Sequence, residues 1–301
     1  MTIQWFPGHM NTAKAAIKEL VSEIDIVIEL LDARAPFSSC NPLIQGIIRH
    51  KKKIRLLNKS DLADPKITQL WINYFRQQDN TLAITGYMND PQQKGRIIQL
   101  CREVAPHRNS FEKPLRVMIS GIPNVGKSTL INQLIGKKSA KTGDIPAVTR
   151  ANQCLNLADD FLIYDTPGMT WQKIHYVQIG YHLALCNSIG RNALDEEVCA
   201  LYLINYLKLN YPLMLCARYK LDNLQLQLDD DQLLELIGKK RGCILARGII
   251  DRQRAGTLIL QDFRENRIGQ ISLETPQLWE KWIEEYKLEL EDENCESELQ
   301  V

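Results

Sequence analysis

The sequence predicts an α/β fold in which a doubly wound, mostly parallel sheet is followed by a smaller, mainly helical domain. Short apolar runs alternate with amphipathic stretches up to about residue 170, and helical periodicity replaces this alternation after about residue 172. The length of 301 residues is sufficient for two domains with buried cores. We therefore expect domains at residues 1–172 and 173–288, followed by an acidic, disordered tail at residues 289–301.

The predicted strands are short apolar runs, which suit a sheet that is buried on both faces. In chain order they are Ile24–Leu31, Ile54–Leu57, Leu82–Thr85, Leu115–Ser120 and Phe161–Tyr164. Helices are predicted where apolar residues recur at helical spacing. These stretches are Thr12–Val21, Ile67–Gln77, Lys127–Ile135, Tyr176–Ser188 and Asp195–Asn210. Since ligands of such sheets bind beyond the carboxyl ends of the strands, the residues after each run are candidates for a site.

The composition, with 45% hydrophobic and 24% charged residues, is typical of a soluble globular protein. No stretch approaches the roughly 18 consecutive apolar residues of a membrane span. The N-terminal residues lack the basic and apolar regions of a signal peptide. We therefore expect a cytoplasmic protein with no membrane partner. The eight cysteines form no Cys-x-x-Cys pair, which argues against a zinc site or a disulfide framework.

Charge is unevenly distributed along the chain. Residues 289–301 carry six acidic and no basic residues, whereas the rest of the chain has 37 basic against 30 acidic residues, a net charge of +7. Basic residues gather at 49–55, 137–141 and 239–254. Contact with nucleic-acid phosphates and solvated helix faces both explain such clusters.

The run Leu115–Ser120 leads directly into Gly121-Ile-Pro-Asn-Val-Gly-Lys-Ser-Thr129 and then into a helical stretch. A phosphate loop requires a strand, a glycine-containing loop and a helix in this order, since backbone N–H groups at the helix N-terminus wrap the phosphates. Lys127 would reach the β- and γ-phosphates, and the Ser128 hydroxyl would bind magnesium. Further phosphate-loop contacts are expected from Asn124, Val125, Gly126 and Thr129.

A guanine-reading motif follows an earlier predicted strand, at Asn58, Lys59, Ser60 and Asp61. The Asp61 carboxylate would accept paired hydrogen bonds from N1–H and the exocyclic amine of guanine. Adenine offers an acceptor at N1 and no amine there, a mismatch that leaves buried polar groups unpaired. Lys59 would lie along the base plane, and Asn58 would tie this loop to the phosphate loop. The second base-contacting segment should follow the next strand, at Thr85 and Gly86.

A further loop is expected to respond to the γ-phosphate. Asp165-Thr-Pro-Gly168 follows the predicted strand Phe161–Tyr164, where Asp165 would hold magnesium through water and the Gly168 amide would sense the γ-phosphate. Thr149 would supply a second magnesium hydroxyl from a segment that is ordered only by the triphosphate. A solvent-exposed loop threonine is the alternative interpretation of Thr149.

The group that orients the attacking water is not where many GTPases carry it. They use a glutamine directly after Asp-x-x-Gly, and this chain has Met169 there, whose thioether cannot orient water. We expect His9 to take this role, because imidazole can both orient and deprotonate water. A histidine packed in an N-terminal turn is an equally good interpretation. Asn124 is expected to help hold a potassium ion against the phosphates.

The order of the two nucleotide motifs is inverted. In most GTP-binding proteins the phosphate loop precedes the guanine-reading motif, whereas here it follows, which indicates a circular permutation that keeps the site and moves the chain ends. With these motifs, the chain resembles the circularly permuted GTPases that act in ribosome biogenesis. The matching motifs are Trp5-Phe-Pro-Gly-His-Met10, Asp32-Ala-Arg-x-Pro36, Asn58-Lys-Ser-Asp61, Gly121-Ile-Pro-Asn-Val-Gly-Lys-Ser-Thr129, Asp165-Thr-Pro-Gly168 and Lys240-Arg-Gly-Cys243.

The resemblance implies a circularly permuted P-loop GTPase domain before the helical domain. It implies an enzyme that binds GTP and GDP with Mg²⁺, that the ribosome stimulates, and that K⁺ stimulates through Asn124. It also implies a catalytic role for His9 and a hydrophobic residue in place of the glutamine, matched by Met169. The implied function is late maturation of the large ribosomal subunit, with ribosomal RNA and proteins as partners and GTP state controlling binding and release. No DNA partner is expected, and the protein should be monomeric off the ribosome.

In this interpretation, the chain that runs from Asp165–Gly168 directly into the second domain couples nucleotide state to partner binding. The residues expected at a ribosomal RNA surface are Lys239, Lys240, Arg241, Arg247, Arg252 and Arg254. Two other classes of function stay open. A P-loop ATPase or kinase is disfavoured by Asp61 and by the lack of a second substrate site. The other class is a regulatory binding module whose hydrolysis is incidental.

Overall fold

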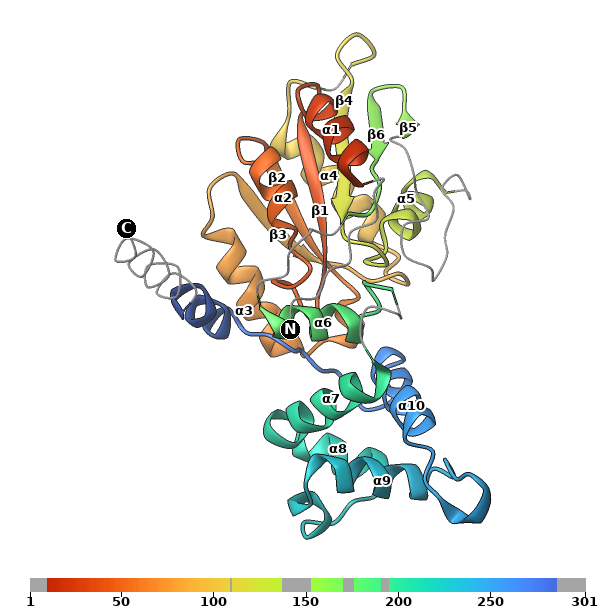
Figure 1. Ribbon diagram of the computed structural model, residues 1–301. Coiled ribbons are helices and arrows are strands. Elements are labelled where there is room, and N and C mark those ends of the chain that lie inside the picture. Colours follow the sequence, from red (N-terminus) through yellow and green to blue (C-terminus); the bar gives the residue numbers. More distant parts are fainter. Residues whose placement is uncertain (1–9, 109, 137–152, 170–175, 191–194, 286–301) are drawn as a thin grey trace, which may run out of the picture.

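The computed structural model describes residues 10–108, 110–136, 153–169, 176–190 and 195–285, with the side chains of 10–14 excepted. Figure 1 shows two parts joined end to end: a sheet flanked by helices, called here the sheet part, and a group of helices below it, called the helical part. The predicted boundary at 172/173 and the predicted tail at 289–301 lie outside the described residues, so both stay predictions.

The sheet has six strands in the order β3-β2-β1-β4-β6-β5. Five of them are parallel, namely β1 (Ile26–Asp32), β2 (Lys52–Asn58), β3 (Thr81–Thr85), β4 (Leu115–Gly121) and β6 (Phe161–Asp165). The edge strand β5 (Gln153–Ala158) is antiparallel to β6. Asp32 pairs in register with Asn58, Leu30 with Gly121, and Ile119 with Asp165. The carboxyl ends of the strands, which carry the predicted motifs, therefore meet along one edge of the sheet.

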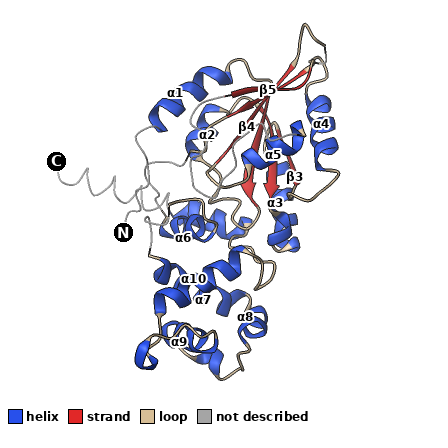
Figure 2. Cartoon of the chain, turned by 90° about the vertical axis from the view of Figure 1, so that its right-hand side faces the viewer, coloured by secondary structure: helices blue, strands red, loops and turns tan. Residues whose placement is uncertain are grey.

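Helices cover both faces of the sheet (Figure 2). Side chains alternate along β1, so that Ile26, Ile28 and Leu30 pack with α4 and α5, whereas Val27 and Leu31 pack with helices on the other face. The helices of this part are α1 (Met10–Val21), α2 (Pro42–Ile47), α3 (Pro65–Arg76), α4 (Gln93–Val104) and α5 (Lys127–Ile135). The arrangement is the predicted doubly wound fold.

The helical part is organised around α7 (Glu196–Asn210), whose start is capped by Asp195 and whose end is followed by Pro212. The other helices are α6 (Val177–Leu185), α8 (Pro212–Tyr219), α9 (Asp230–Lys240) and α10 (Arg252–Arg264). Short 3₁₀ helices lie at Ser60–Leu62 (η1), Gln225–Gln227 (η3) and Ala246–Gly248 (η4). Among the described residues, no helix is long and apolar enough to cross a membrane.

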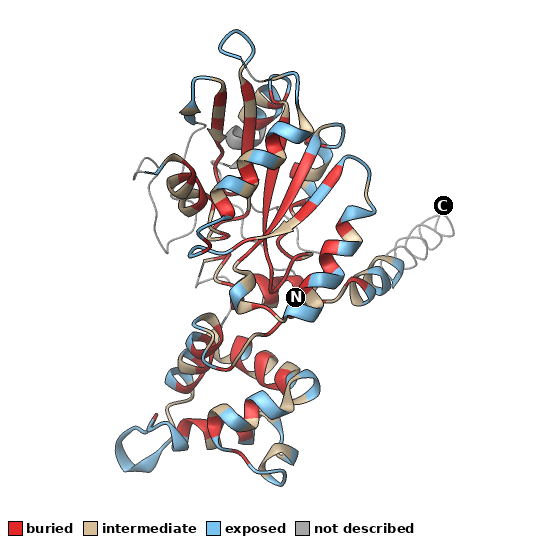
Figure 3. Cartoon of the chain, turned by 180° about the vertical axis from the view of Figure 1, so that it is seen from behind, coloured by how far each residue is buried: buried red, intermediate tan, exposed pale blue. Residues whose placement is uncertain are grey.

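The two parts pack against each other at their junction, where buried residues continue from one part into the other (Figure 3). Helix α6 contributes Ile179 and Leu183 to the core under the sheet, and Leu185 to the core of the helical part. After α10 the chain returns to the sheet part, where Trp279 stacks on Phe37 with ring centroids 3.0 Å apart. The chain therefore crosses the junction twice.

The five predicted strands are confirmed, with small shifts at their ends. In the sheet part, helices α2 and α4 and strand β5 were not predicted, and in the helical part α8, α9 and α10 were expected only as general helical periodicity. Helix α2 has six residues, too few for a periodic pattern. Strand β5 has no fully buried residue, because it lies at an edge of the sheet and is only partly covered on the face that carries Leu155 and Leu157, so its sequence lacks the apolar run of the other strands.

A buried polar cluster connects the two parts. The Glu274 carboxylate accepts hydrogen bonds from the backbone N–H groups of Phe37 and Ser38, and from the Ser38 hydroxyl. His182 Nδ1 lies 2.7 Å from the same carboxylate, and its Nε2 lies 2.9 Å from the Tyr202 hydroxyl. Glu274 and His182 are each 1% exposed. Removing one partner would leave several buried groups unpaired.

Replacement of this carboxylate should therefore strongly reduce stability. We expect Glu274→Ala to lower the free energy of unfolding by about 3–5 kcal/mol, since buried donors and His182 lose their acceptor. Chemical denaturation at neutral pH measures the effect. The matched control is Glu280→Ala, at an exposed position, which should change stability by less than about 0.5 kcal/mol. Equal stability of the two variants would contradict a structural role for the cluster.

Candidate nucleotide-binding site

The phosphate loop joins β4 to α5 and is sharply turned at its end. Gly126 has a φ of 107°, in the left-handed region that favours glycine. A Cβ atom at this position would lie 2.3 Å from Asn58 Nδ2. Glycine is therefore required both by the backbone and by the close approach of the guanine-reading loop. The N–H groups of the first turn of α5, where Ser128 and Thr129 lie, have no partner inside the helix and are suited to an anion.

Lys127 is placed across this loop. Its ammonium group donates to the backbone carbonyls of Gly121 and Ile122, both at 3.0 Å, and the residue is 7% exposed. Burial lowers the pKa of Lys127 to about 8, although the nearby Asp165 carboxylate partly opposes this. The buried charge of Lys127 is thus energetically unfavourable in the free protein, and phosphate oxygens would stabilise it.

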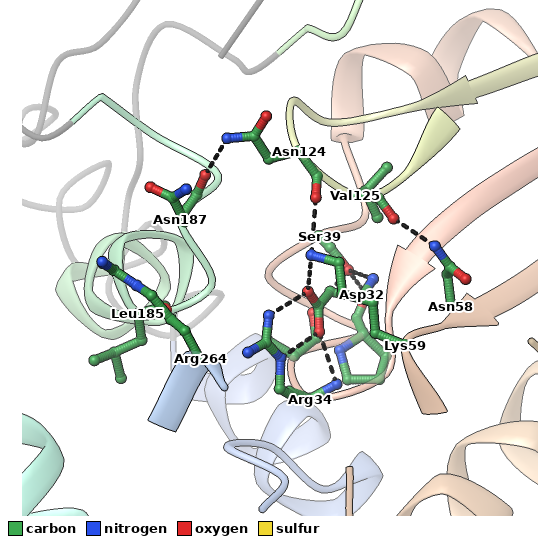
Figure 4. Close-up of polar contacts among 12 residues, drawn as sticks. Asp32, Arg34, Ser39, Asn58, Lys59, Asn124, Val125, Leu185, Asn187 and Arg264 are labelled. Atoms are coloured by element: carbon green, nitrogen blue, oxygen red, sulfur yellow. Dashed lines mark hydrogen bonds and ion pairs between the residues drawn. The ribbon is translucent and has the colours of Figure 1, made fainter. Parts of the chain in front are cut away.

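The guanine-reading loop is tied directly to the phosphate loop (Figure 4). Asn58 Nδ2 donates to the Val125 carbonyl at 2.7 Å, and Lys59 Nζ donates to the Asn124 carbonyl at 2.8 Å. The tie expected from Asn58 is therefore present, and Lys59 makes a second one. The two loops form one unit although about 60 residues separate them along the chain.

The two segments expected to contact the base lie side by side. The backbone N–H and the hydroxyl of Ser60 both donate to the Gly86 carbonyl, at 3.1 and 3.2 Å. Thr85 ends β3, directly before Gly86. Asp61 lies in η1, and its side chain is exposed, as the reading of a base requires. The structure thus brings Ser60, Asp61, Thr85 and Gly86 together at one end of the site.

The loop after β6 lies against the phosphate loop. Asp165 is 1% exposed and lies close enough to Lys127 to affect its pKa. A Cβ atom on Gly168 would lie 2.9 Å from Lys127 Nζ, so only glycine fits there without displacement. A carboxylate from Asp165 and a hydroxyl from Ser128 are oxygen donors of the kind that Mg²⁺ prefers. These two residues would hold the ion beside Lys127, and the ion would neutralise phosphate charge.

Two predicted residues, His9 and Thr149, lie outside the described residues. Met169, which occupies the position of the usual glutamine, is 2% exposed and belongs to a buried cluster with Ile17 and Val21 of α1. Its backbone carbonyl accepts a hydrogen bond from Asn41 Nδ2 at 2.8 Å. Met169 therefore serves as packing for α1, the helix that begins directly after His9.

Sequence reasoning assigned no role to Asp32, which proves to be central. This residue ends β1 with no exposed surface and accepts hydrogen bonds from Arg34 Nε at 2.9 Å and from Lys59 Nζ at 3.0 Å (Figure 4). Burial alone would raise the pKa of Asp32, but the Arg34 and Lys59 cations hold it well below its usual range. An acidic residue directly after an apolar strand run was the available signal.

Another unpredicted contact joins the phosphate loop to the helical part. Asn124 Nδ2 donates to the backbone carbonyl of Asn187 at 2.8 Å, just beyond the end of α6 (Figure 4). Arg264 of α10 donates to the carbonyls of Ala184 and Leu185 at the same end of α6, at 2.9 and 3.1 Å. The predicted phosphate loop is therefore linked to α6 and, through it, to α10.

Nucleotide affinity should fall as the pH rises above about 8. Phosphates favour the charged ammonium, so nucleotide binding raises the pKa of Lys127. Where Lys127 is neutral in the free protein, it must take up a proton when the nucleotide binds, and this uptake becomes less favourable as the pH rises. From the pKa of about 8, we expect the Kd of a fluorescent GDP analogue to increase about fivefold to tenfold between pH 7.5 and 9. Fluorescence titration measures the change. Lys127→Arg keeps its charge and should lose most of this dependence; an equal slope in both proteins would contradict the assignment.

Known proteins are similar to this chain over most of its length. The RsgA GTPase family model matches residues 11–175, and the model described as 50S ribosome-binding GTPase matches residues 116–241. Ribosome biogenesis GTPase A of Priestia megaterium is 40% identical over 285 residues, which cover 92% of this chain and 98% of the relative. The protein of the same name from Thermotoga maritima is 30% identical over 276 residues, covering 91% and 95%.

Solved structures agree with the sequence relatives. The crystal structure of GNP-bound YlqF from Thermotoga maritima has a TM-score of 0.62 at 26% identity and covers 88% of this chain and 98% of that chain. A GDP-bound YlqF structure has a TM-score of 0.64 at 27% identity and covers 87% and 99%. The fold is thus a circularly permuted P-loop GTPase domain followed by helices. This chain is a GTPase of ribosome biogenesis that binds guanine nucleotides, and it belongs to the ribosome biogenesis GTPase A family.

Proposed function

We propose that this GTPase acts in late maturation of the large ribosomal subunit, in the cytoplasm, and that its GTP state controls ribosome binding and release. The observation that carries the proposal is the contact of Asn124 with Asn187, because it links the phosphate loop to the helical part. The matched family described as 50S ribosome-binding GTPase supports the choice of subunit. Off the ribosome the protein is a monomer.

Coupling in this proposal runs along two routes. Phosphates that bind at the loop change the surroundings of Asn124, whose partner Asn187 lies at the end of α6. The γ-phosphate also acts on Gly168, from which the chain leads into the same helix. The first route is a direct hydrogen bond and the second is short along the sequence, so that a small shift at the phosphates changes the position of the helices of the helical part.

The proposed partner surface lies around α9 and the turn that follows it. Ile244 and Ile250 pair across this turn, and the basic side chains around it are exposed, as phosphate binding requires. They are Lys239, Lys240, Arg241, Arg247 and Arg254. Arg252, predicted with them, is instead ion-paired with Glu197, Asp231 and Glu235, so it supports the packing of α7, α9 and α10.

We assign the remaining roles as follows. Ser128, Thr149 and Asp165 hold Mg²⁺, Asn124 helps hold K⁺, and His9 orients and deprotonates the attacking water. The burial of Met169 supports the need for a group from elsewhere. The residues that contact the nucleotide are Asn58, Lys59, Ser60, Asp61, Thr85, Gly86, Asn124, Val125, Gly126, Lys127, Ser128, Thr129 and Gly168. The domains are residues 1–172 and 173–288, with a tail at 289–301.

Hydrolysis tests the catalytic assignments. We expect His9→Ala to lower kcat by about 100-fold or more, because the water loses its base, with little change in GTP affinity.

Asn124→Ala should remove the advantage of K⁺ over Na⁺ in phosphate release assays on large subunits. The control His107→Ala, at an exposed position, should behave as wild type. Normal hydrolysis by His9→Ala, or an intact K⁺ advantage in Asn124→Ala, would refute the respective role.

Co-sedimentation tests the partner. Wild type should pellet with large subunits in a non-hydrolysable GTP analogue and much less in GDP. Arg241→Glu combined with Arg247→Glu should weaken this binding by about tenfold or more, because phosphate contacts are lost and repulsion is added. The matched control reverses two exposed lysines of the sheet part, Lys18→Glu and Lys66→Glu. Binding to small subunits alone, or equal effects of both double variants, would overturn the proposal.

A further inference from the structure

The chain that follows α10 returns along the guanine-reading loop. Residues 266–274, called here the return segment, pass from the helical part to the sheet part (Figure 1). Gln270 Nε2 donates to the Asp61 carbonyl at 3.1 Å, and Asn266 Nδ2 donates to the same oxygen at 3.4 Å. The Ile271 N–H donates to the Leu62 carbonyl at 3.1 Å. The return segment thus forms hydrogen bonds with the backbone of Asp61, the residue expected to read guanine.

The return segment forms two more hydrogen bonds with the sheet part. The Asp64 N–H donates to the Ser272 hydroxyl at 3.2 Å, and the Leu273 N–H donates to the Arg34 carbonyl at 2.7 Å. Ser272 is 1% exposed. The segment therefore contacts both the guanine-reading loop and the loop after β1, which carries the cation that neutralises Asp32.

Two sets of contacts hold the guanine-reading loop. In the first set, Asn58 and Lys59 tie it to the phosphate loop, and Ser60 ties it to Gly86. In the second set, the return segment holds the Asp61 carbonyl. The Asp61 side chain projects from a short 3₁₀ turn that begins after a left-handed residue, so its direction follows the position of this backbone. Both supports therefore determine where its carboxylate meets the base.

The return segment belongs to the core of the helical part. Ile268, Ile271 and Leu273 are buried in that core. The hydroxyl groups of Tyr206 and Tyr211 donate to the Ser272 carbonyl, at 2.8 and 3.2 Å. A displacement of α7 therefore moves the segment with it.

We infer that the return segment is a positioning element for guanine recognition, which sets the residence time of GDP and GTP alike. The base is common to both nucleotides, and the hydrogen bonds described above lead from the segment to the guanine-reading loop and to Arg34, not to the phosphate loop. Its effect should therefore be equal for the two, unlike an effect that passes through Asn124. The inference rests on guanine-nucleotide binding by this family and does not depend on the ribosomal partner.

The test is the dissociation rate of fluorescent GDP and of a fluorescent, non-hydrolysable GTP analogue. The variant combines Gln270→Ala with Asn266→Gly, since glycine keeps the left-handed φ of 59° while removing the side chain. Loss of both hydrogen bonds should raise both rates by about fivefold to tenfold. The circular dichroism spectrum and the melting temperature should stay close to those of the wild type, which separates faster release from loss of folded protein.

The control is Gln261→Ala, an exposed glutamine of α10 whose amide bonds only to Glu265 of its own helix. It should leave both rates within twofold of wild type. If thermal melting shows that the double variant is unfolded, Ser272→Ala decides, because it removes only the acceptor for Asp64, and about a threefold rise is expected. Unchanged rates, a change for one nucleotide only, or the same rise in Gln261→Ala would overturn the inference.

Discussion

The nucleotide site depends on one buried charge. The Asp32 carboxylate ends strand β1 with no exposed surface, and such a group is tolerated only where cationic donors surround it. Lys59 and Arg34 are those donors, and Lys59 also reaches the phosphate loop. The Arg34 guanidinium lies 5.1 Å from the centre of the Phe263 ring in the helical part. One carboxylate thus orders two nucleotide loops and one helix relative to each other.

Circular permutation is compatible with this arrangement because strand neighbours, not chain order, assemble the site. Strand β1 lies between β2, which leads to the guanine-reading loop, and β4, which leads to the phosphate loop. All three are parallel, so their ends meet whichever strand comes first along the chain. What permutation changes is the element that follows β6. In this chain that element is α6, which joins the nucleotide site to the helical part.

Most of what the sequence predicted correctly depends on local pattern, although the local pattern of α4 was missed. The phosphate loop, the motif Asn58–Asp61 and five strands each carry their signal within about ten residues. The contacts of Asp32 with Lys59, of Asn124 with Asn187, and of the return segment with Asp61 join residues far apart in the chain, and no local pattern encodes them. At Arg252 a local pattern was misleading. Its basic neighbourhood in the sequence indicated a nucleic-acid surface, but carboxylates from other helices form ion pairs with it in the fold.

Helix α6 limits how modular the protein is. Its residues Ile179 and Leu183 fill the core under the sheet, while Leu185 fills that of the helical part. A fragment cut on either side of this helix would therefore leave one core with a cavity and exposed apolar surface. The two parts cannot be exchanged between proteins as independent units, and they should unfold as one cooperative body. Evolution of the helical part is accordingly constrained by the packing of a nucleotide-binding sheet that it does not contain.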